Sequence, residues 1–376
     1  MQTVSYRDVT LKSGFLYEKQ LLNRNAAMDA VYDRFSETGR IGAFRFDWKP
    51  GMPNQPHFFW DSDVAKWMEG AAYILQKERD PELEAKVESL IDDIEAHQED
   101  SGYFNIYFTV CEPDKRFSNR DWHELYCAGH LFEAAVAYYE ATGKDRFLLL
   151  MEKYADFIKK IFVDEKSAAF STPGHEEIEL ALIKLYRHTG ERKYLEMARF
   201  FLENRAKAEN EKHPPDGNPK YFQDDADIYN LKEANGHCVR ALYLYCGIAD
   251  LAAETGDGRL TENLRSVFSD ITLRKMYSTG GVGSTYRGES FTVPYDLPNF
   301  TAYTESCAAI AMVLFAVRMR ELDTDARYGH AVERVLYNAA LSSTSLDGKA
   351  FFYENPLEIA LEDYGRETAV REKSRE

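Results

Sequence analysis

The sequence has few cysteines and no long apolar run. Its 376 residues include only 5 cysteines, an odd number without the spacing of a disulfide framework, so we expect free thiols. The longest apolar stretch, 308–317, is shorter than the roughly 18 residues that a membrane-spanning helix needs. No basic region followed by an apolar segment, the pattern of a secretory signal, is visible at the start, so a cytoplasmic location is predicted.

The sequence is also short of positive charge. It has 46 Lys and Arg against 63 Asp and Glu, a formal net charge of −17. A surface of this sign repels phosphate backbones and anionic lipids, so neither nucleic acid nor membrane is an expected partner. Hydrophobic residues nevertheless make up 44% of the chain, which is enough for a large core and excludes a disordered protein.

Apolar residues recur every three or four positions in eleven segments of helical length. The predicted helices cover residues 16–37, 62–78, 81–98, 122–141, 145–162, 174–188, 191–206, 231–255, 258–273, 302–322 and 325–342. Four of the connections share a Thr-Gly pair, at 38–39, 142–143, 189–190 and 255–256. Because glycine can end a helix in the left-handed conformation, these pairs predict tight helical hairpins.

An imperfect repeat underlies the hairpins, since GHLFEAAVAYY, GHEEIELALIK and GHCVRALYLYC follow one pattern. Repeated helical pairs can stack as an open solenoid or close into a ring of six pairs. The returns between hairpins, at 39–61, 99–121, 207–230 and 274–301, are long and rich in Gly, Pro and aromatic residues. Long loops of this kind are typical of functional sites in compact domains, so we favour the closed ring.

The predicted fold class is therefore all-α, an (α/α)6 toroid that forms a single domain over residues 1–376. Eleven helices leave such a ring one helix short, and we expect the domain to be truncated at its C-terminal end. A strand-like piece from Lys349 to Tyr353 predicts minor β-structure in the loops.

Histidine recurs near the starts of the repeats: His130, His175 and His237 each follow a glycine, and His123 opens the string HELYCAGH. Two interpretations are open. The imidazoles either satisfy backbone groups at helix ends or line one polar site, where a neutral ring offers sugar hydroxyls a donor and an acceptor. Aromatic residues in the returns, such as Trp60, suit the apolar faces of sugar rings.

Two carboxylates in suggestive places are Glu289, in a glycine-rich return, and Glu305, at a predicted helix start. Glycosidic cleavage commonly uses two carboxyl groups, one of which protonates the leaving oxygen; the alternative is two ordinary surface glutamates. Cys307 lies two residues beyond Glu305, a spacing that needs an irregular turn before both side chains can bind one metal ion. From the residues alone, we interpret Cys307 as a small buried hydrophobe, as we do Cys127, Cys238 and Cys246.

Several longer strings resemble one family. FWDSDVAKWMEGAAY, WHELYCAGHLFEAAVAYYEATGK, KMYSTGGVGS and YDLPNFTAYTESCAAIA are similar to glycoside hydrolase family 127, the β-L-arabinofuranosidases. The similarity extends from about Val9 to Leu357. The catalytic domain of this family is a toroid of six helical hairpins followed by β-sandwich domains, so the resemblance implies the fold expected above.

The resemblance also implies a zinc-assisted, retaining, exo-acting hydrolysis of β-L-arabinofuranosides in plant-type glycans. The nucleophile is then a cysteine thiolate, which zinc keeps deprotonated, and a glutamic acid protonates the departing oxygen. Glu289 in RGESF is similar to the acid/base of the family, and Glu305 and Cys307 in YTESCA are similar to two of its zinc ligands. The positions similar to its sugar contacts are His123, His175, His237, Glu333 and Tyr353.

One part of the family pattern is absent. A Cys-x-Cys-Cys-Pro-Pro-Asn segment supplies the nucleophile and the remaining zinc ligands in the family, and the sequence does not contain it. We expect this segment beyond Glu376, so the chain alone should be inactive and bind zinc weakly or not at all. The alternatives are a relative that acts on another furanose or an acidic sugar, or an inert glycan-binding helical module. The expected partner is a small carbohydrate, and a homodimer is compatible with the sequence.

Overall fold

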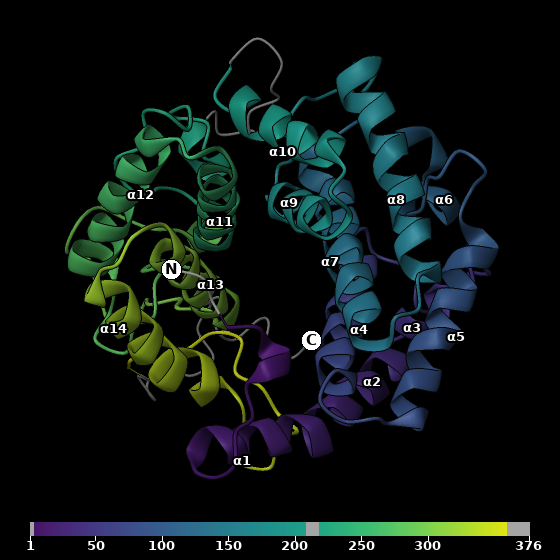
Figure 1. Ribbon diagram of the computed structural model, residues 1–376, viewed down its shortest axis with the longest axis horizontal. Helices are drawn as coiled ribbons and strands as arrows, with labels where there is room; N and C mark the ends of the chain where they lie inside the picture. The colour runs from purple at the N-terminus through teal and green to yellow at the C-terminus, as the bar shows by residue number, and fades with distance from the viewer. Residues whose placement is uncertain (1–3, 208–217, 359–376) are drawn as a thin grey trace. The chain divides into compact units, whose positions relative to one another are not determined.

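The structure is a computed structural model that describes residues 4–207 and 218–358 (Figure 1). The described residues form two compact units: an N-terminal unit, Val4–Asn204, and a C-terminal unit, Arg205–Lys207 together with 218–358. The single domain over the whole chain stays a prediction. Residues 208–217 of one predicted return and the tail after residue 358 lie outside the described residues.

All eleven predicted segments are helical, so the all-α fold class is confirmed. The helices of the N-terminal unit are α1 (Phe15–Leu22), α2 (Met28–Glu37), α3 (Arg40–Ala43), α4 (Trp60–Leu75), α5 (Pro81–His97), α6 (Tyr107–Val110), α7 (Glu124–Thr142), α8 (Arg146–Lys159), α9 (Ile178–Thr189) and α10 (Arg192–Asn204). Those of the C-terminal unit are α11 (Cys238–Thr255), α12 (Gly258–Asp270), α13 (Ser306–Leu322) and α14 (Ala326–Val335).

The Thr-Gly joints form as predicted. Gly39, Gly143, Gly190 and Gly256 all have positive φ, between 67° and 86°. In each joint the threonine hydroxyl donates a hydrogen bond to the carbonyl four residues earlier, at 2.7–2.9 Å. The same cap therefore ends α2, α7, α9 and α11, because only glycine enters the left-handed region without a steric penalty.

The helices of each unit differ in how much of their circumference is buried. Every residue from Cys238 to Ala252 in α11 is buried, and most of α7 is buried as well. In contrast, α8, α10 and α12 bury one face and expose the other. An all-round apolar helix belongs inside a unit and an amphipathic one outside, so α7 packs between α4 and α9, and α11 packs against α13.

Three predicted helix starts, 174, 231 and 302, are too early by four or more residues, and two of them bear on the site. α11 begins at Cys238 because Gly236 has φ 68°, and α13 begins at Ser306 because Thr304 has φ 38°. A residue with positive φ interrupts a right-handed helix, and the apolar pattern does not reveal it. Both interruptions create the turns that carry the site described below.

The minor β-structure amounts to isolated pairings in the described residues. Phe351 pairs with Thr344, so the predicted piece at 349–353 is an isolated bridge and not a continuous strand. The other pairings include His237 with Ser290 and Thr285 with Ser290, which fix the turn that bears Glu289.

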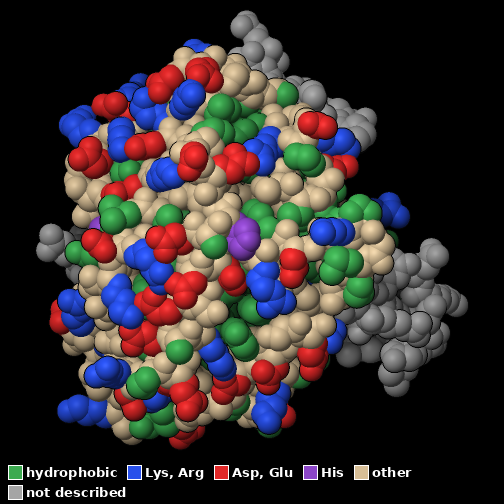
Figure 2. Space-filling view, turned by 90° about the vertical axis from the view of Figure 1, so that its right-hand side faces the viewer, with side chains coloured by type: hydrophobic (Ala, Val, Ile, Leu, Met, Phe, Trp, Pro, Cys, Tyr) green, Lys and Arg blue, Asp and Glu red, His purple; other side chains and the backbone are tan. Residues whose placement is uncertain are grey.

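On the face that Figure 2 shows, acidic and basic side chains are interspersed, and neither sign dominates a large patch. In the described part of the chain, no helix combines the length and apolar character required to cross a lipid bilayer.

Candidate functional site

Glu289 lies in a strained turn of the C-terminal unit. It has φ 52° and follows Gly288 with φ 67°, a conformation that costs a non-glycine residue about 1 kcal/mol. Its carboxylate accepts two hydrogen bonds, from Nε2 of His237 to Oε2 at 2.8 Å and from the hydroxyl of Tyr303 to Oε1 at 2.9 Å. The turn therefore holds this carboxyl group in one orientation.

The tautomer of His237 follows from its position. His237 is the N-cap of α11, and its Nδ1 accepts a hydrogen bond from the backbone N–H of Arg240 at 3.3 Å. A neutral imidazole that accepts at Nδ1 carries its proton at Nε2, so His237 is the donor toward Glu289.

Glu305, Cys307 and Tyr353 lie near the same carboxylate. Glu305 is the buried N-cap of α13, and Cys307 is half-buried in the first turn of that helix. The backbone N–H of Ser306 donates to the carbonyl of Tyr353 at 2.9 Å, which ties this turn to Tyr353. Tyr353 is about half exposed, but neighbouring groups desolvate its phenol, and this effect, followed by the negative charges of Glu305, Cys307 and Glu289, raises the pKa of Tyr353.

The structure thus brings His237, Glu289, Glu305, Cys307 and Tyr353 together, and adds Tyr303. Tyr303 was missed because one tyrosine among 24 has no distinguishing local pattern. Glu333 is different: it is exposed on α14, and no hydrogen bond or ion pair joins it to this group among the described residues.

All five cysteines are thiols, as expected. Cys127, Cys238 and Cys246 are buried, as the apolar interpretation predicted, whereas Cys307 is only half-buried. Burial and the carboxylates of Glu305 and Glu289 raise the pKa of the Cys238 thiol. Cys238 is therefore the unreactive, protonated thiol near Glu289.

His123 and His175 form a second pair, in the N-terminal unit. Their ring centroids lie 5.5 Å apart, and both Nδ1 atoms donate to backbone carbonyls, to that of Asp121 at 2.7 Å and to that of Glu176 at 2.9 Å. Since a carbonyl only accepts, each neutral ring has its acceptor at Nε2. His123 has φ 60°, so this pair also depends on a strained backbone.

Aromatic rings surround the histidine pair. Phe58 lies 5.5 Å from the ring of His123, and Tyr126 lies 4.3 Å from that of His175. Lys66 places its ammonium 4.7 Å from the ring of Tyr126. Phe58 belongs to the return 39–61, so one aromatic residue of the returns lies beside His123.

Comparison with known proteins identifies the family to which the chain belongs. Residues 8–374 match the GH127 catalytic domain, described as beta-L-arabinofuranosidase. The chain belongs to glycoside hydrolase family 127. It is 39% identical over 319 residues to a non-reducing end beta-L-arabinofuranosidase of Bifidobacterium longum subsp. longum, covering 80% of this chain and 48% of that protein.

Two solved GH127 structures are similar over nearly the whole chain. Ara127N-Se, a beta-L-arabinofuranosidase from Geobacillus stearothermophilus T6, is 42% identical, with a TM-score of 0.90 that covers 96% of this chain and 60% of that one. The GH127 beta-arabinofuranosidase BT3674 is 35% identical, with a TM-score of 0.86 over 94% of this chain and 56% of that one. The GH127 fold predicted from the sequence is therefore confirmed, and the chain spans about half the length of the curated relative.

His130 differs from His123, His175 and His237 in its position within the fold. The sequence predicts a histidine at a helix start, but His130 lies inside α7 and is fully packed. Burial, and then the charges of Lys66 and Lys184, lower its pKa, so the ring is neutral. The expectation that Gly-His marks a helix start holds for His237 but is wrong for His130.

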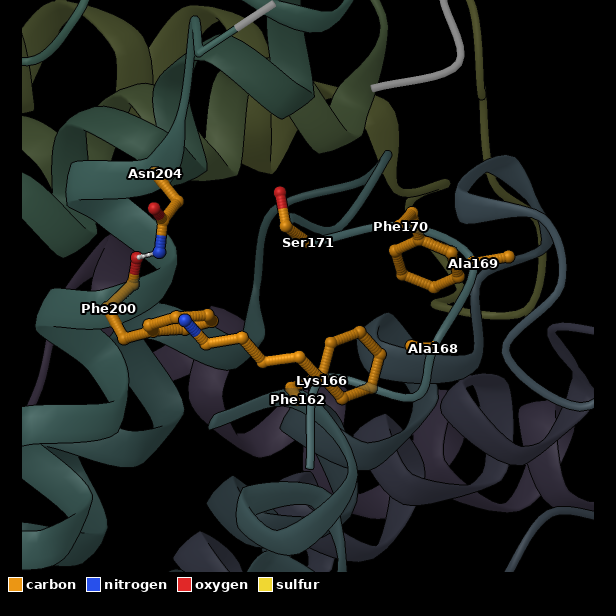
Figure 3. A pocket seen from close by; sticks show the side chains of 8 residues that line it. All are labelled: Phe162, Lys166, Ala168, Ala169, Phe170, Ser171, Phe200 and Asn204. Carbon is orange, nitrogen blue, oxygen red and sulfur yellow. Dashed lines mark hydrogen bonds between the residues drawn. The ribbon is translucent and has the colours of Figure 1, made fainter. Parts of the chain in front are cut away.

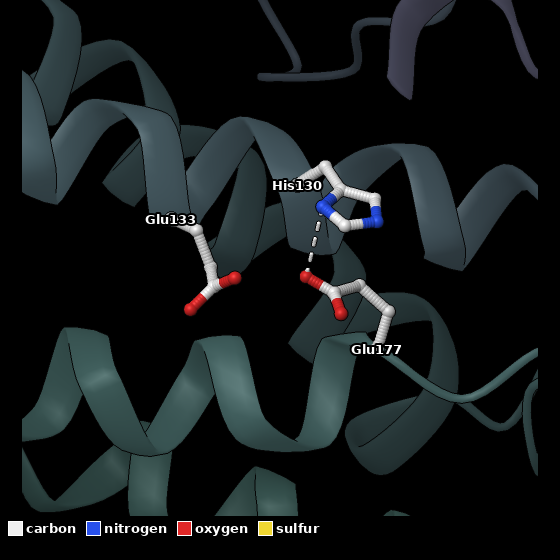
Figure 4. A group of neighbouring side chains, drawn as sticks. All are labelled: His130, Glu133 and Glu177. Carbon is white, nitrogen blue, oxygen red and sulfur yellow. Dashed lines mark ion pairs between the residues drawn. The ribbon is translucent and has the colours of Figure 1, made fainter. Parts of the chain in front are cut away.

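Figure 4 shows His130 beside Glu133 and Glu177, the one group of metal-ligand type found in the described residues. Nδ1 of His130 lies 3.1 Å from Oε1 of Glu177. Burial, and then the neighbouring carboxylates of Glu133 and Glu69, raise the pKa of Glu177, so both partners of this contact are uncharged. The contact is therefore a close approach of an uncharged carboxyl group and an uncharged imidazole.

Lys184 already occupies the cation position of this cluster. Its Nζ lies 2.9 Å from Glu69 and 3.3 Å from Glu133. A divalent ion would have to displace the proton of Glu177 and approach this ammonium, which is unfavourable at such distances. The geometry could offer three ligands, but the ammonium of Lys184 already contacts one of them, Glu133, as well as Glu69.

A pocket of about 170 Å³ lies in the N-terminal unit (Figure 3). Phe162, Phe170 and Phe200 line it together with Lys166 and small residues. No carboxylate or imidazole lines it, so it offers no group for acid–base chemistry.

Proposed function

We propose that this chain is the catalytic domain of a retaining, exo-acting β-L-arabinofuranosidase for plant-type glycans, in which Glu289 is the general acid/base. The observation that carries the proposal is the position of the Glu289 carboxyl group between His237 and Tyr303. A carboxyl group fixed by two partners is suited to deliver a proton to one place.

The two partners of Glu289 differ in what they can do. The Nε2–H of His237 can only donate, whereas the hydroxyl of Tyr303 can donate or accept. When Glu289 is protonated, the proton therefore belongs at Oε1, next to Tyr303. After the proton passes to the leaving oxygen, both partners donate to the carboxylate and stabilise it, and the carboxylate can then take a proton from water.

His123, His175, His237, Glu333 and Tyr353 are proposed as contacts to the sugar hydroxyls, on their similarity to the family motif. The acceptor at Nε2 of His123 and His175 suits a hydroxyl donor, and Phe58 supplies an apolar surface beside them. Glu333 is supported by its motif alone.

Glu305 and Cys307 fit two zinc ligands. The donor set is a buried carboxylate and a thiol at the irregular start of α13, where the spacing of two residues no longer separates them around a regular helix. Zinc bound there would lower the pKa of a coordinating thiol. The nucleophile and the other ligands are predicted to lie outside this sequence, so the proton transfers by Glu289 are the chemical steps that belong to this chain.

The test uses the full-length gene product and 4-nitrophenyl β-L-arabinofuranoside. We expect hydrolysis with retention of the anomeric configuration, and Glu289→Gln should lower kcat at least about a hundredfold. Glu262→Gln, on the exposed face of α12, is the matched control and should retain activity. An active Glu289→Gln enzyme would disprove the assignment.

Two alternatives predict other outcomes. A family member with a different specificity would cleave another furanoside or an acidic glycoside and leave this substrate intact. A glycan-binding module would bind arabinan fragments without hydrolysing any of them. A cytoplasmic location and a homodimer stay predictions from the sequence.

A further inference from the structure

A second pocket, of about 360 Å³, lies in the C-terminal unit beside Glu289. We name it the Arg287 pocket; its walls include Lys220, Tyr221, Gly236, Lys275, Arg287 and Ser290. Gly236 and Ser290 adjoin His237 and Glu289 in the chain, and His237 pairs with Ser290 across the turn. The pocket and the proposed acid/base therefore share two stretches of backbone, 236–237 and 289–290, although neither Glu289 nor His237 is among the residues that line the pocket.

This part of the pocket wall is rigid before any ligand binds. The buried amide Nε2 of Gln223 donates to the carbonyls of Tyr221 and Asn235, both at 3.1 Å. The N–H of Phe291 donates to the carbonyl of Gly236 at 2.9 Å. A Cβ at position 236 would lie 1.8 Å from the carbonyl oxygen of Lys220, so only glycine allows this close approach. A preformed wall of this kind is typical of small-molecule sites.

The charge of the pocket is opposite to that of the whole chain. Lys275 is buried and paired with Asp270 at 3.0 Å, and Lys220 lies 3.7 Å from Glu233. Arg287 is exposed at the pocket and makes no ion pair among the described residues. Lys275 and Lys220 each have a carboxylate partner, so the guanidinium of Arg287 is the charge that these pairs do not neutralise. It lies in a protein whose formal net charge is −17.

We propose that the Arg287 pocket binds a leaving group that carries a carboxylate, such as a uronic acid residue to which the terminal furanose is attached. The inference rests on the function proposed above, because the acid that protonates the leaving oxygen must face the leaving group. Arg287 is two residues from Glu289, and a planar guanidinium matches a carboxylate in two parallel hydrogen bonds. The ring of Tyr221 and the hydroxyls of Thr285 and Ser290 supply the contacts that the rest of a sugar needs.

The test compares two aryl β-L-arabinofuranosides on the full-length enzyme, with 3-carboxyphenyl and 3-carbamoylphenyl leaving groups of the same shape. We expect kcat/KM to favour the carboxylate about fivefold, and the preference to shrink in high salt. Arg287→Gln should bring the ratio of the two kcat/KM values close to one. Lys232→Gln, an exposed lysine outside the pocket, is the matched control and should keep the ratio.

The outcomes separate this inference from the function on which it rests. Equal kcat/KM values for both substrates in the wild-type enzyme would overturn the pocket assignment and leave the glycosidase intact. If neither substrate is hydrolysed, binding of D-galacturonate and D-galactose is compared by NMR line broadening. Binding of galacturonate that depends on Arg287 would then support the pocket, and equal behaviour of the two sugars would refute it.

Discussion

Nε2 of His237 lies 2.8 Å from Oε2 of Glu289, although 52 residues separate them in the chain. His237 is the N-cap of α11, and Glu289 lies in a turn with positive φ. The hydrogen bond therefore joins a helix start to a tight turn. The backbone pairing of His237 with Ser290, the residue after Glu289, holds the helix start and the turn side by side. The position of the Glu289 carboxyl group therefore depends on contacts between separate elements of the C-terminal unit and not on its own loop alone.

Tyr303 should contribute to catalysis through Glu289. Tyr303→Phe removes the hydroxyl that lies 2.9 Å from Oε1, and we expect kcat to fall about tenfold with a smaller change in KM, because a hydrogen bond to a charged group is lost. Steady-state kinetics on the full-length enzyme measure this effect. Tyr277→Phe is the control, since the hydroxyl of Tyr277 donates to the carbonyl of Pro298. Equal kinetics for the two variants would contradict the role of Tyr303.

Gly129 should be needed for the close approach of α7 to the start of α9. A methyl group there would lie 2.7 Å from Cγ of Glu177 and 2.9 Å from the backbone nitrogen of Ile178. Gly129→Ala should therefore lower the free energy of unfolding by about 1–3 kcal/mol in urea denaturation.

Gly329→Ala provides the matched comparison. Gly329 is also inside a helix, α14, but nothing lies within 4 Å of the added methyl group. Alanine should then stabilise the protein by about 0.5–1 kcal/mol, because the unfolded chain loses conformational freedom. If Gly129→Ala stabilises the protein as Gly329→Ala is expected to do, the packing argument for Gly129 is wrong.

Glu124 should make the stability of the protein depend on pH. Burial outweighs the hydrogen bonds from the N–H of Phe117 and the hydroxyl of Tyr103 and raises the pKa of Glu124 to about 8. A raised folded-state pKa means that the stability is fully present below the unfolded pKa, near 4.5, and declines as the pH rises toward 8. One such group changes the free energy of unfolding by up to about 1.4 kcal/mol per pH unit within this window.

Glu124→Gln tests this dependence, because the amide reproduces the protonated carboxyl group and does not titrate. The variant should gain stability relative to the wild type between about pH 5 and pH 8, as measured by urea unfolding at both values. Glu112→Gln is the control, since the hydrogen bond from Lys115 lowers the pKa of Glu112 and it titrates below this window. Parallel stability curves for the wild type and Glu124→Gln would refute the pKa assignment.

Lys184 should act as the structural cation of the cluster around His130. Burial opposes its charge, but the carboxylates of Glu133 and Glu69 outweigh this effect and raise the pKa of Lys184. Lys184→Met leaves both carboxylates without their ammonium, and we expect a loss of about 2 kcal/mol in the free energy of unfolding. Lys193→Met, which breaks a more exposed pair with Asp156, should cost less than about 1 kcal/mol. A larger loss for Lys193→Met would argue against a structural role of the cluster.

The sequence by itself determined the helices, the hairpin joints and the family. Apolar periodicity and the left-handed glycines are local properties, so α2, α7, α9 and α11 could be predicted with their C-terminal ends. Glu289 could also be singled out from the sequence, because the motif RGESF that resembles the family consists of consecutive residues.

Only the tertiary structure decided which side chains meet. The contacts of Glu289 with His237 and Tyr303, the neutral contact of His130 with Glu177, and the walls of the Arg287 pocket all join residues from separate elements. The same is true of the late starts of α11 and α13, which depend on positive φ values at Gly236 and Thr304. Hydrophobic periodicity reports which face of a helix is buried, but contact, protonation and strain depend on the neighbours that folding brings close.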